Sequence, residues 1–432
     1  MRAITNHLSW ILTLASCLLI SLAFMLTACG KAGVVIPAEA EFDTSLFTHR
    51  QAAPVAEPQH SEAATSAPVY VPTIDTDKVM SSPDYGMQVF LYWQAEIADR
   101  DLNLVREAGF RWVKQEIPWR EVEGHGKGIW QWDSSDRVMD QIEAHGLKVI
   151  IRLGSQPAWA APEVELPNIA PPQDMQDFYD YVFTVANRYR GRVAAYQIWN
   201  EPNLAREWGG QAPNPAAYVE LLKVGYQAVK DADPQAIVIS AGLAPTTRND
   251  DQAMPDIYFY QGMYDAGAIP YFDSLGVHAA GYKSPPEIDP AEVAADPVLT
   301  NGDTSPERLR RVYAFRHVED VRDLMVRNGD QAKKIVILEV GWTIDPRPDS
   351  PYFWQAVSPE QQDKYLQRAY GYAEAHWQPW IGVMSLIYIA HPSWHWGHEE
   401  TYWSIVYPGY PDLRTSPAYY GVLTMPKIPP VP

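Results

Sequence analysis

Residues 194–203 read Ala194-Ala-Tyr-Gln-Ile-Trp-Asn-Glu-Pro-Asn203. The apolar and aromatic side chains of residues 194–199 favour a buried β-strand, and the polar residues that follow mark its end. In the flanking segments, 174–189 and 216–231, apolar residues recur every three or four positions, as amphipathic helices require. A short apolar strand between two such helices is the repeating unit of a parallel α/β fold.

The same unit recurs along the chain from about Tyr85 onward. The strand candidates are residues 86–92, 112–117, 148–153, 194–199, 236–241, 274–278, 334–339 and 382–388. The helix candidates are residues 98–108, 134–145, 174–189, 216–231, 306–328 and 359–376, with Gly109, Gly146 and Gly191 marking helix ends. Roughly eight βα units over about 350 residues predict an α/β fold with a single (β/α)8 TIM barrel. A doubly wound open sheet is the alternative, but no glycine-rich phosphate loop follows any strand candidate.

The N-terminal 79 residues differ from the rest in composition. An apolar run over residues 8–26 is preceded by Arg2 and ends in Leu26-Thr-Ala-Cys29, which predicts an export signal in residues 1–28. The last four of these residues resemble a bacterial lipobox, which implies cleavage before Cys29 and lipidation of its thiol. Residues 29–79 are rich in Ala, Pro, Glu, Ser and Thr without apolar periodicity, which predicts a flexible linker.

From this layout we expect a membrane-anchored lipoprotein, outside the cytoplasm, with its folded domain in residues 80–432. An uncleaved transmembrane helix is the alternative reading of the apolar run.

The composition narrows the function classes. The 53 acidic and 34 basic residues give a formal charge of -19, and no run of Lys or Arg is present to neutralise phosphates, so nucleic acid is not an expected partner. Both cysteines, Cys17 and Cys29, lie in the first thirty residues, which leaves none for a disulfide or a metal site in the folded domain. The 16 Trp and 25 Tyr supply flat rings that suit sugar faces as well as a core.

Two glutamates end strand candidates. Glu201 follows the fourth, and Glu339 ends the seventh in Ile335-Val-Ile-Leu-Glu-Val-Gly-Trp342. Strand C-terminal ends gather at one face of a barrel, so both side chains should lie in one cleft. Two carboxyls in one cleft are what glycosidic bond cleavage uses, since one protonates the leaving oxygen while the other attacks or activates water. The alternative is that either glutamate only binds a neighbouring loop.

Trp199-Asn-Glu-Pro-Asn203, together with Glu339, resembles glycoside hydrolase clan A, the retaining barrel glycosidases. The segments 117–123, 128–133 and 146–152 resemble its β-xylosidase-like and cellulase-like families, so that the resemblance covers nearly all of residues 85–427. It implies double displacement with Glu339 as nucleophile and Glu201 as acid/base, their carboxyls roughly 5 to 5.5 Å apart. It also implies that Asn200 binds the sugar 2-hydroxyl.

Further residues are candidates for the sugar site. His278 and Tyr282 resemble the clan's histidine and following tyrosine, although Ala279 and Ala280 alter the spacing and leave a contact from Tyr282 to Glu339 open. Arg152 is a candidate to keep Glu339 ionised, with a structural salt bridge as the alternative. Glu116 and Trp119 follow the second strand candidate and are candidates to line the site, with core packing as the alternative for Trp119.

The richest loop runs Tyr388-Ile-Ala-His-Pro-Ser-Trp-His-Trp-Gly-His-Glu-Glu400. Its histidines and acids suggest a metal-dependent hydrolase, but no zinc-hydrolase spacing is present. We expect instead that Trp394 or Trp396 forms a stacking platform for sugar, with no metal and no cofactor.

The sequence therefore predicts a retaining glycoside hydrolase acting on a β-linked polysaccharide or oligosaccharide. The alternatives are an inactive carbohydrate-binding surface lipoprotein, and a metal-dependent hydrolase that uses residues 391–400.

Overall fold

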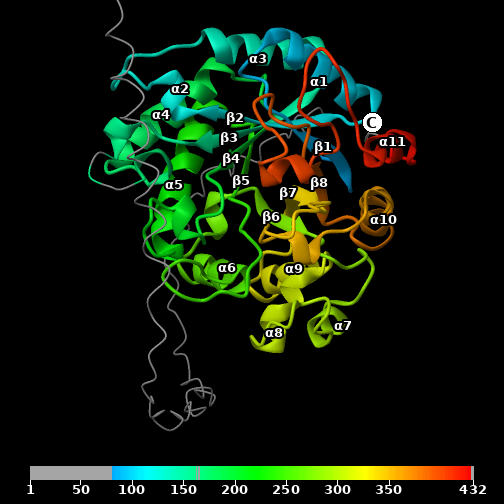
Figure 1. Cartoon of the computed structure of the whole chain (residues 1–432). Coiled ribbons are helices and arrows are strands. Elements are labelled where there is room, and N and C mark those ends of the chain that lie inside the picture. The colour runs from blue at the N-terminus through cyan, green and yellow to red at the C-terminus, as the bar shows by residue number, and fades with distance from the viewer. Residues whose placement is uncertain (1–79, 162, 164–165, 430–432) are drawn as a thin grey trace, which may run out of the picture. The chain divides into compact units, whose positions relative to one another are not determined.

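The computed structural model describes residues 80–161, 163 and 166–429. In this part of the chain eight strands close into a barrel in chain order (Figure 1). They are β1 (Asp84–Gln88), β2 (Trp112–Pro118), β3 (Lys148–Gly154), β4 (Ala195–Ile198), β5 (Ile237–Ile239), β6 (Ser274–Ala280), β7 (Lys334–Gly341) and β8 (Ile381–Leu386). All neighbours are parallel, and β1 closes the barrel by pairing with β8 from Asp84 and Val383 onward. The predicted (β/α)8 barrel is confirmed.

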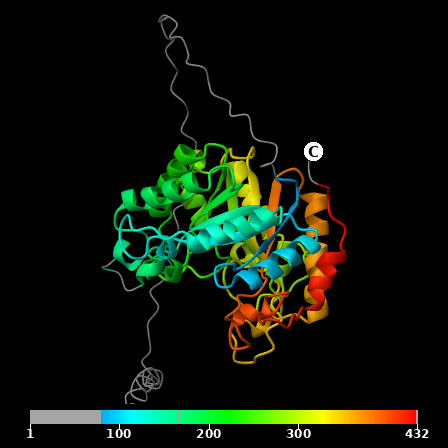
Figure 2. The same cartoon turned by 90° about the horizontal axis from the view of Figure 1, so that it is seen from above.

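Helices surround the strands on the outside of the barrel (Figures 1 and 2). They are α1 (Ala95–Glu107), α2 (Trp119–Val122), α3 (Asp133–Ala144), α4 (Met175–Arg188), α5 (Pro215–Ala232), α6 (Asp256–Asp265), α7 (Pro290–Ala295), α8 (Glu307–Arg310), α9 (His317–Arg327), α10 (Pro359–His376) and α11 (Pro417–Thr424). The glycines predicted to follow helices, Gly109, Gly146 and Gly191, all have positive φ, the conformation that ends a helix and favours glycine.

The prediction of one helix over residues 306–328 is wrong. A 3-10 turn at Arg311–Tyr313 separates α8 from α9. The sequence prediction also omitted α6, α7 and α11. The helical period of α6 is weak because its buried face includes the polar Asp256, while the apolar Ile257 and Tyr258 are only partly buried.

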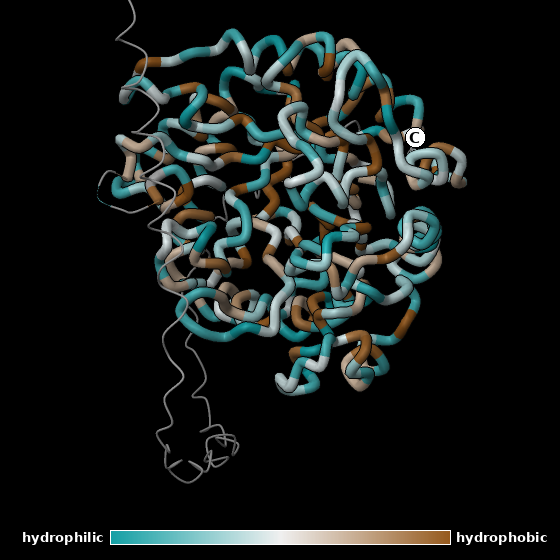
Figure 3. Tube along the Cα trace, viewed as in Figure 1, coloured by the Kyte–Doolittle hydropathy of each residue, from teal (hydrophilic) through white to brown (hydrophobic). Residues whose placement is uncertain are grey.

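The core has two layers. A small cluster that includes Trp112, Ile150, Ala195 and Leu338 packs inside the barrel, and a larger one packs between strands and helices. Hydrophobic and hydrophilic residues alternate along much of the trace (Figure 3). Side chains of a strand alternate between its two faces, so Lys114 and Glu116 face inward like Trp112, and both are charged. The interior of the barrel is therefore apolar at the start of β2 and polar towards its end.

In the described part of the chain, no helix combines the length and apolar character needed to cross a bilayer. The predicted signal in residues 1–28, Cys29 and the linker in residues 29–79 lie outside the described residues.

Candidate active site

The structure brings Glu201 and Glu339 together. Nδ1 of His278, on β6, lies 2.8 Å from Oε1 of Glu201 and 3.7 Å from Oε2 of Glu339. One oxygen of each carboxylate and one ring nitrogen of His278 all lie within 4.8 Å of one another. Both glutamates are largely buried, with 14% and 17% of their side chains exposed. The two predicted carboxyls thus face one another with His278 in contact with both.

A β-bulge aims Glu339 into the cleft. Val277 pairs with Ile337, but the next pair along β6 and β7 is His278 with Glu339, so Leu338 is skipped. Leu338 packs inside the barrel, and strict alternation would turn the next residue outward. The bulge supplies the extra residue that lets Glu339 face inward as well, a common use of bulges beside active sites.

The end of β4 has an unusual backbone. Trp199 and Glu201 have φ of +70° and +43°, in the region that side chains other than glycine avoid. Conformations of this kind cost about 1 to 3 kcal/mol each and persist where the surroundings hold them. Here the N–H of Trp199 donates to Leu153 O at 2.9 Å, its indole N–H donates to Glu207 O at 2.9 Å, and the N–H of Glu201 donates to Gly242 O at 3.0 Å.

Lys114 is the cation that contacts Glu339. Its Nζ donates to Oε1 of Glu339 at 3.0 Å and to the carbonyl of Leu338 at 3.2 Å, and only 2% of its side chain is exposed. Burial alone would raise the pKa of Glu339, but the nearby charges of His278, Lys114 and Arg152 bring it down to about 2. Lys114 was not among the predicted site residues. The sequence feature that could have identified it is a charged residue at an inward-facing position of a buried strand.

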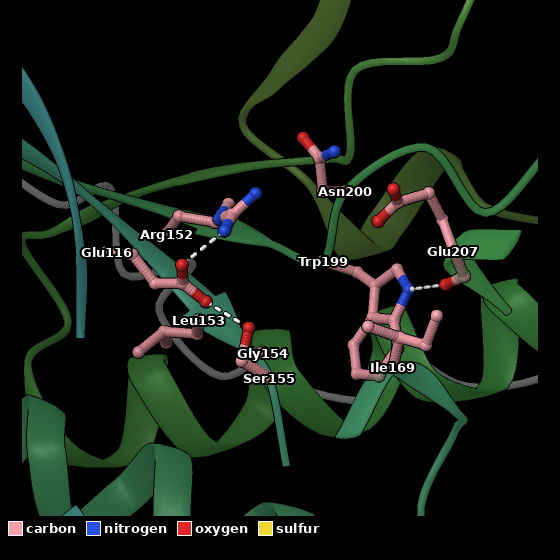
Figure 4. Close-up of a pocket in the computed structure, with 9 residues that line it drawn as sticks. All are labelled: Glu116, Arg152, Leu153, Gly154, Ser155, Ile169, Trp199, Asn200 and Glu207. Carbon is pink, nitrogen blue, oxygen red and sulfur yellow. Dashed lines mark hydrogen bonds and ion pairs between the residues drawn. The ribbon is translucent and has the colours of Figure 1, made fainter. Parts of the chain in front are cut away.

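Arg152 does not contact Glu339 directly, so the predicted charge pair is wrong in this detail. Its guanidinium donates to Glu116, which also accepts from the hydroxyl of Ser155 (Figure 4). These three residues, with Asn200 and Glu207, are among those that line a small pocket. Arg152 therefore acts on Glu339 only through its charge at longer range.

Tyr282 does not orient Glu339. Its hydroxyl donates to the carbonyl of Pro245 at 2.7 Å, although the ring lines the cleft. The position of His278 depends instead on Gly242, because a Cβ at that position would lie 2.2 Å from Cδ2 of the imidazole. Tyr282, which follows His278 at the altered spacing, therefore contacts Pro245 rather than Glu339.

A cleft of about 710 Å³, open to solvent, contains both carboxylates. Its other lining residues include Asn200, Tyr282 and Trp394, as predicted, and Arg152. Glu116 lies in the adjoining small pocket.

The predicted sugar contact of Trp119 is wrong, and of the two alternatives for the stacking platform Trp394 lines the cleft while Trp396 does not. Trp119 is fully buried, stacks on Tyr181 at 4.9 Å between ring centroids and donates to Glu123, so it belongs to the core. Trp396 is 44% exposed but packs on Tyr402 and Tyr407, outside the lining of the cleft. Residue type and loop position alone did not distinguish Trp119 and Trp396 from Trp394, which lines the cleft.

Glu207 is a third carboxyl in the cleft that the sequence analysis missed. Burial, followed by the charge of Glu201, raises its pKa to about 7. Arg206 lies on the same loop, with its Nη2 3.9 Å from Oε2 of Glu201. The sequence feature that could have identified Glu207 and Arg206 is their position on the loop that follows β4.

The described residues give no support to the alternative of a metal site in residues 391–400. Within the described residues, the one group of three His, Cys, Asp or Glu side chains close enough to share an ion is Glu201, His278 and Glu339. In the loop, Nδ1 of His395 and of His398 instead accept backbone N–H groups of the same loop.

Comparison with known proteins finds similarity to glycosidases. The model of glycoside hydrolase family 42, described as β-galactosidase, matches residues 89–205, less than a third of the chain. The match includes β2, β3, Asn200 and Glu201 but ends before Glu339. A search of curated proteins finds no match.

Several similar solved structures are described as glycosidases. A family 39 glycoside hydrolase from Bacteroides cellulosilyticus WH2 is 19% identical with a TM-score of 0.59, over 82% of this chain and 65% of that one. A glucosidase from Croceicoccus marinus is 13% identical with a TM-score of 0.54, over 80% and 67%. A β-galactosidase from Marinomonas ef1 is 13% identical with a TM-score of 0.52, over 79% and 58%. The chain thus spans less than two thirds of the first and third of these proteins.

These similarities agree with the resemblance to clan A, to which families 39 and 42 belong. The barrel of this chain is therefore similar in fold to glycoside hydrolases of that clan.

Proposed function

We propose that the protein is a retaining glycoside hydrolase that cleaves O-glycosidic bonds of a β-linked glycan or oligosaccharide. The observation that carries this proposal is the pair Glu201 and Glu339, which face one another in an open cleft, with the ammonium of Lys114 3.0 Å from a carboxylate oxygen of Glu339. The match to the β-galactosidase family over residues 89–205 supports glycosidase activity independently.

In the first step the ionised Glu339 attacks the anomeric carbon. The bond to the leaving oxygen breaks, and Glu201 gives that oxygen its proton, which leaves the sugar esterified to Glu339. The low pKa of Glu339 favours this assignment, because a nucleophile must be deprotonated at working pH.

In the second step Glu201 takes a proton from water, which attacks the anomeric carbon and releases Glu339. Asn200, beside the acid in the cleft, is positioned to bind the 2-hydroxyl of the same sugar. Carboxylate oxygens within 4.8 Å of each other support retention, since inverting enzymes leave about 6.5 to 9.5 Å between the carboxyls for a water molecule.

The cleft has the size of an ordinary ligand site. At about 710 Å³ it lies within the range of roughly 300 to 1,000 Å³ of small-molecule pockets, and because it is open to solvent its shape does not limit the substrate to a single sugar. Aromatic side chains such as Trp394 in its wall suit the faces of sugar rings.

The test is hydrolysis of aryl β-glycosides, including galactosides, glucosides and xylosides, and of β-glycan polymers. Glu339→Gln should abolish turnover. Glu201→Gln should slow release of poor leaving groups far more than good ones, because only poor ones need protonation. Loss of activity on adding a chelator would contradict this mechanism. A wild type that binds a glycan without cleaving it would favour the carbohydrate-binding alternative.

We further propose that the chain is exported and anchored to the membrane through lipid on Cys29. Support comes from the apolar run in residues 8–26 and the small residues before Cys29. Cys29→Ser should abolish labelling by radioactive fatty acid and release the protein from the membrane fraction. Unlabelled wild-type protein would contradict the proposal.

A further inference from the structure

A continuous set of aromatic rings leads out of the cleft, which we call the aromatic rim: Phe90, Trp93, His391 and Trp394. Phe90 and Trp394 line the cleft, with ring centroids 4.9 Å apart. His391 contacts Phe90 at 5.4 Å, and Trp93 contacts His391 at 5.5 Å, both edge to face. The rim therefore begins inside the cleft and ends outside its lining.

Trp93 ends the rim at the surface. It is 63% exposed, tied with Val298 as the most exposed of the large hydrophobic residues in the described chain. A single exposed apolar residue needs no explanation, but an exposed indole continuous with a binding cleft marks a ligand surface.

The two loops that carry the rim are held in place. After β1, the N–H of Leu91 donates to Gln115 at 2.9 Å, and Arg137 donates to the carbonyls of Leu91 and Tyr92 at 3.0 and 2.6 Å. After β8, the N–H of Ile389 donates to the carbonyl of Gln88 at 3.1 Å, which joins this loop to the end of β1. A surface held in this way loses little entropy when it binds a ligand.

His391 presents an uncharged ring. Its Nδ1 accepts the backbone N–H of Ser393 at 3.1 Å, so that nitrogen carries no proton. Burial, followed by the charge of His398, lowers the pKa of the imidazole further. The rim is thus a neutral aromatic surface at neutral pH, suited to the apolar face of an uncharged sugar rather than to an anion.

We propose that the aromatic rim is an outer subsite that stacks a further sugar ring of a neutral β-glycan bound across Glu201 and Glu339, with Trp93 as its platform. This inference rests on the proposed function. It adds that the preferred substrate is an uncharged oligosaccharide long enough to reach from the two carboxylates to Trp93.

The test compares Trp93→Ala with wild type on aryl β-glycosides and on β-1,4-linked cello-, xylo- and galacto-oligosaccharides of increasing length. Loss of one stacked ring should lower kcat/KM about tenfold for oligosaccharides above a threshold length, mainly through KM. Short aryl glycosides should be unaffected. Trp93→Phe should restore much of the loss.

Trp396→Ala is the matched control, because it removes an exposed indole from the loop after β8 that lies outside the cleft lining. It should leave the length dependence unchanged. If aryl glycosides are cleaved but wild type and Trp93→Ala have equal kcat/KM at every oligosaccharide length, the outer subsite is overturned and the proposed function stands. If wild type cleaves nothing, the proposed function fails. Equal affinity of both proteins for the same oligosaccharides would then overturn the outer subsite as well.

Discussion

Replacing Lys114 with Met should raise the pKa of Glu339 and move the acid limb of the activity profile upward. The ammonium of Lys114 lies 3.0 Å from Glu339 Oε1, and both groups are largely buried. At an effective dielectric of about 20, opposite charges at this distance attract by roughly 5 kcal/mol, which corresponds to about four pKa units. Since His278 and Arg152 remain, we expect the pKa of Glu339 to rise by at least about two units.

The acid limb moves upward because Glu339 acts as the nucleophile. Glu339 is active when ionised, so activity is lost as pH falls through its pKa, which is about 2 in the wild type. In Lys114→Met the loss should set in at pH 4 or above, by the shift of about two units worked out from the ion pair.

The assay is kcat/KM for one aryl β-glycoside between pH 3 and 9. Lys114→Arg, which keeps the positive charge, is the matched control and should resemble the wild type at the acid end. Thermal unfolding at each pH separates loss of ionisation from loss of fold. An unchanged acid limb in folded Lys114→Met would refute the assignment of Glu339 as the ionised nucleophile stabilised by this lysine.

Three further predictions concern residues around the site and in the scaffold. Gly242→Ala should displace His278, because the added Cβ would lie 2.2 Å from the imidazole, and lower kcat at least about tenfold; unchanged kcat would show that His278 needs no fixed position. Trp119→Ala should reduce the free energy of unfolding by about 3 to 5 kcal/mol in urea while leaving KM unchanged, and a raised KM would return this indole to the sugar site. Burial would lower the pKa of His317, but its two flanking aspartates raise it to about 10, so its stabilisation is fully present below about pH 6.5 and lost as pH rises through 10. The unfolding free energy of the wild type should therefore fall over this range more than that of His317→Asn, and parallel curves would contradict the ion pair.

The sequence was sufficient for the barrel because each strand is a short apolar run next to a helix of clear period. Glu201 and Glu339 were found for the same reason, since a charged residue at the end of a buried strand stands out. The side of the barrel on which both lie followed from the common direction of parallel strands.

What the sequence did not reveal depends on register and on side-chain packing. Lys114 was passed over as part of a strand, because its contact with Glu339 joins β2 to β7 across the barrel. The bulge that turns Glu339 inward has no local signature, since it arises from the pairing of β6 with β7. Trp119 and Trp394 look alike in sequence, and only packing assigns one to the core and the other to the cleft.

The most direct test of the central claim is to follow the anomeric configuration of the first sugar released, by proton NMR, while trapping the intermediate with a slow 2-fluoro glycoside. We expect release of the β-anomer and a covalent sugar on the peptide that contains Glu339. Release of the α-anomer, or a label on another residue, would contradict it.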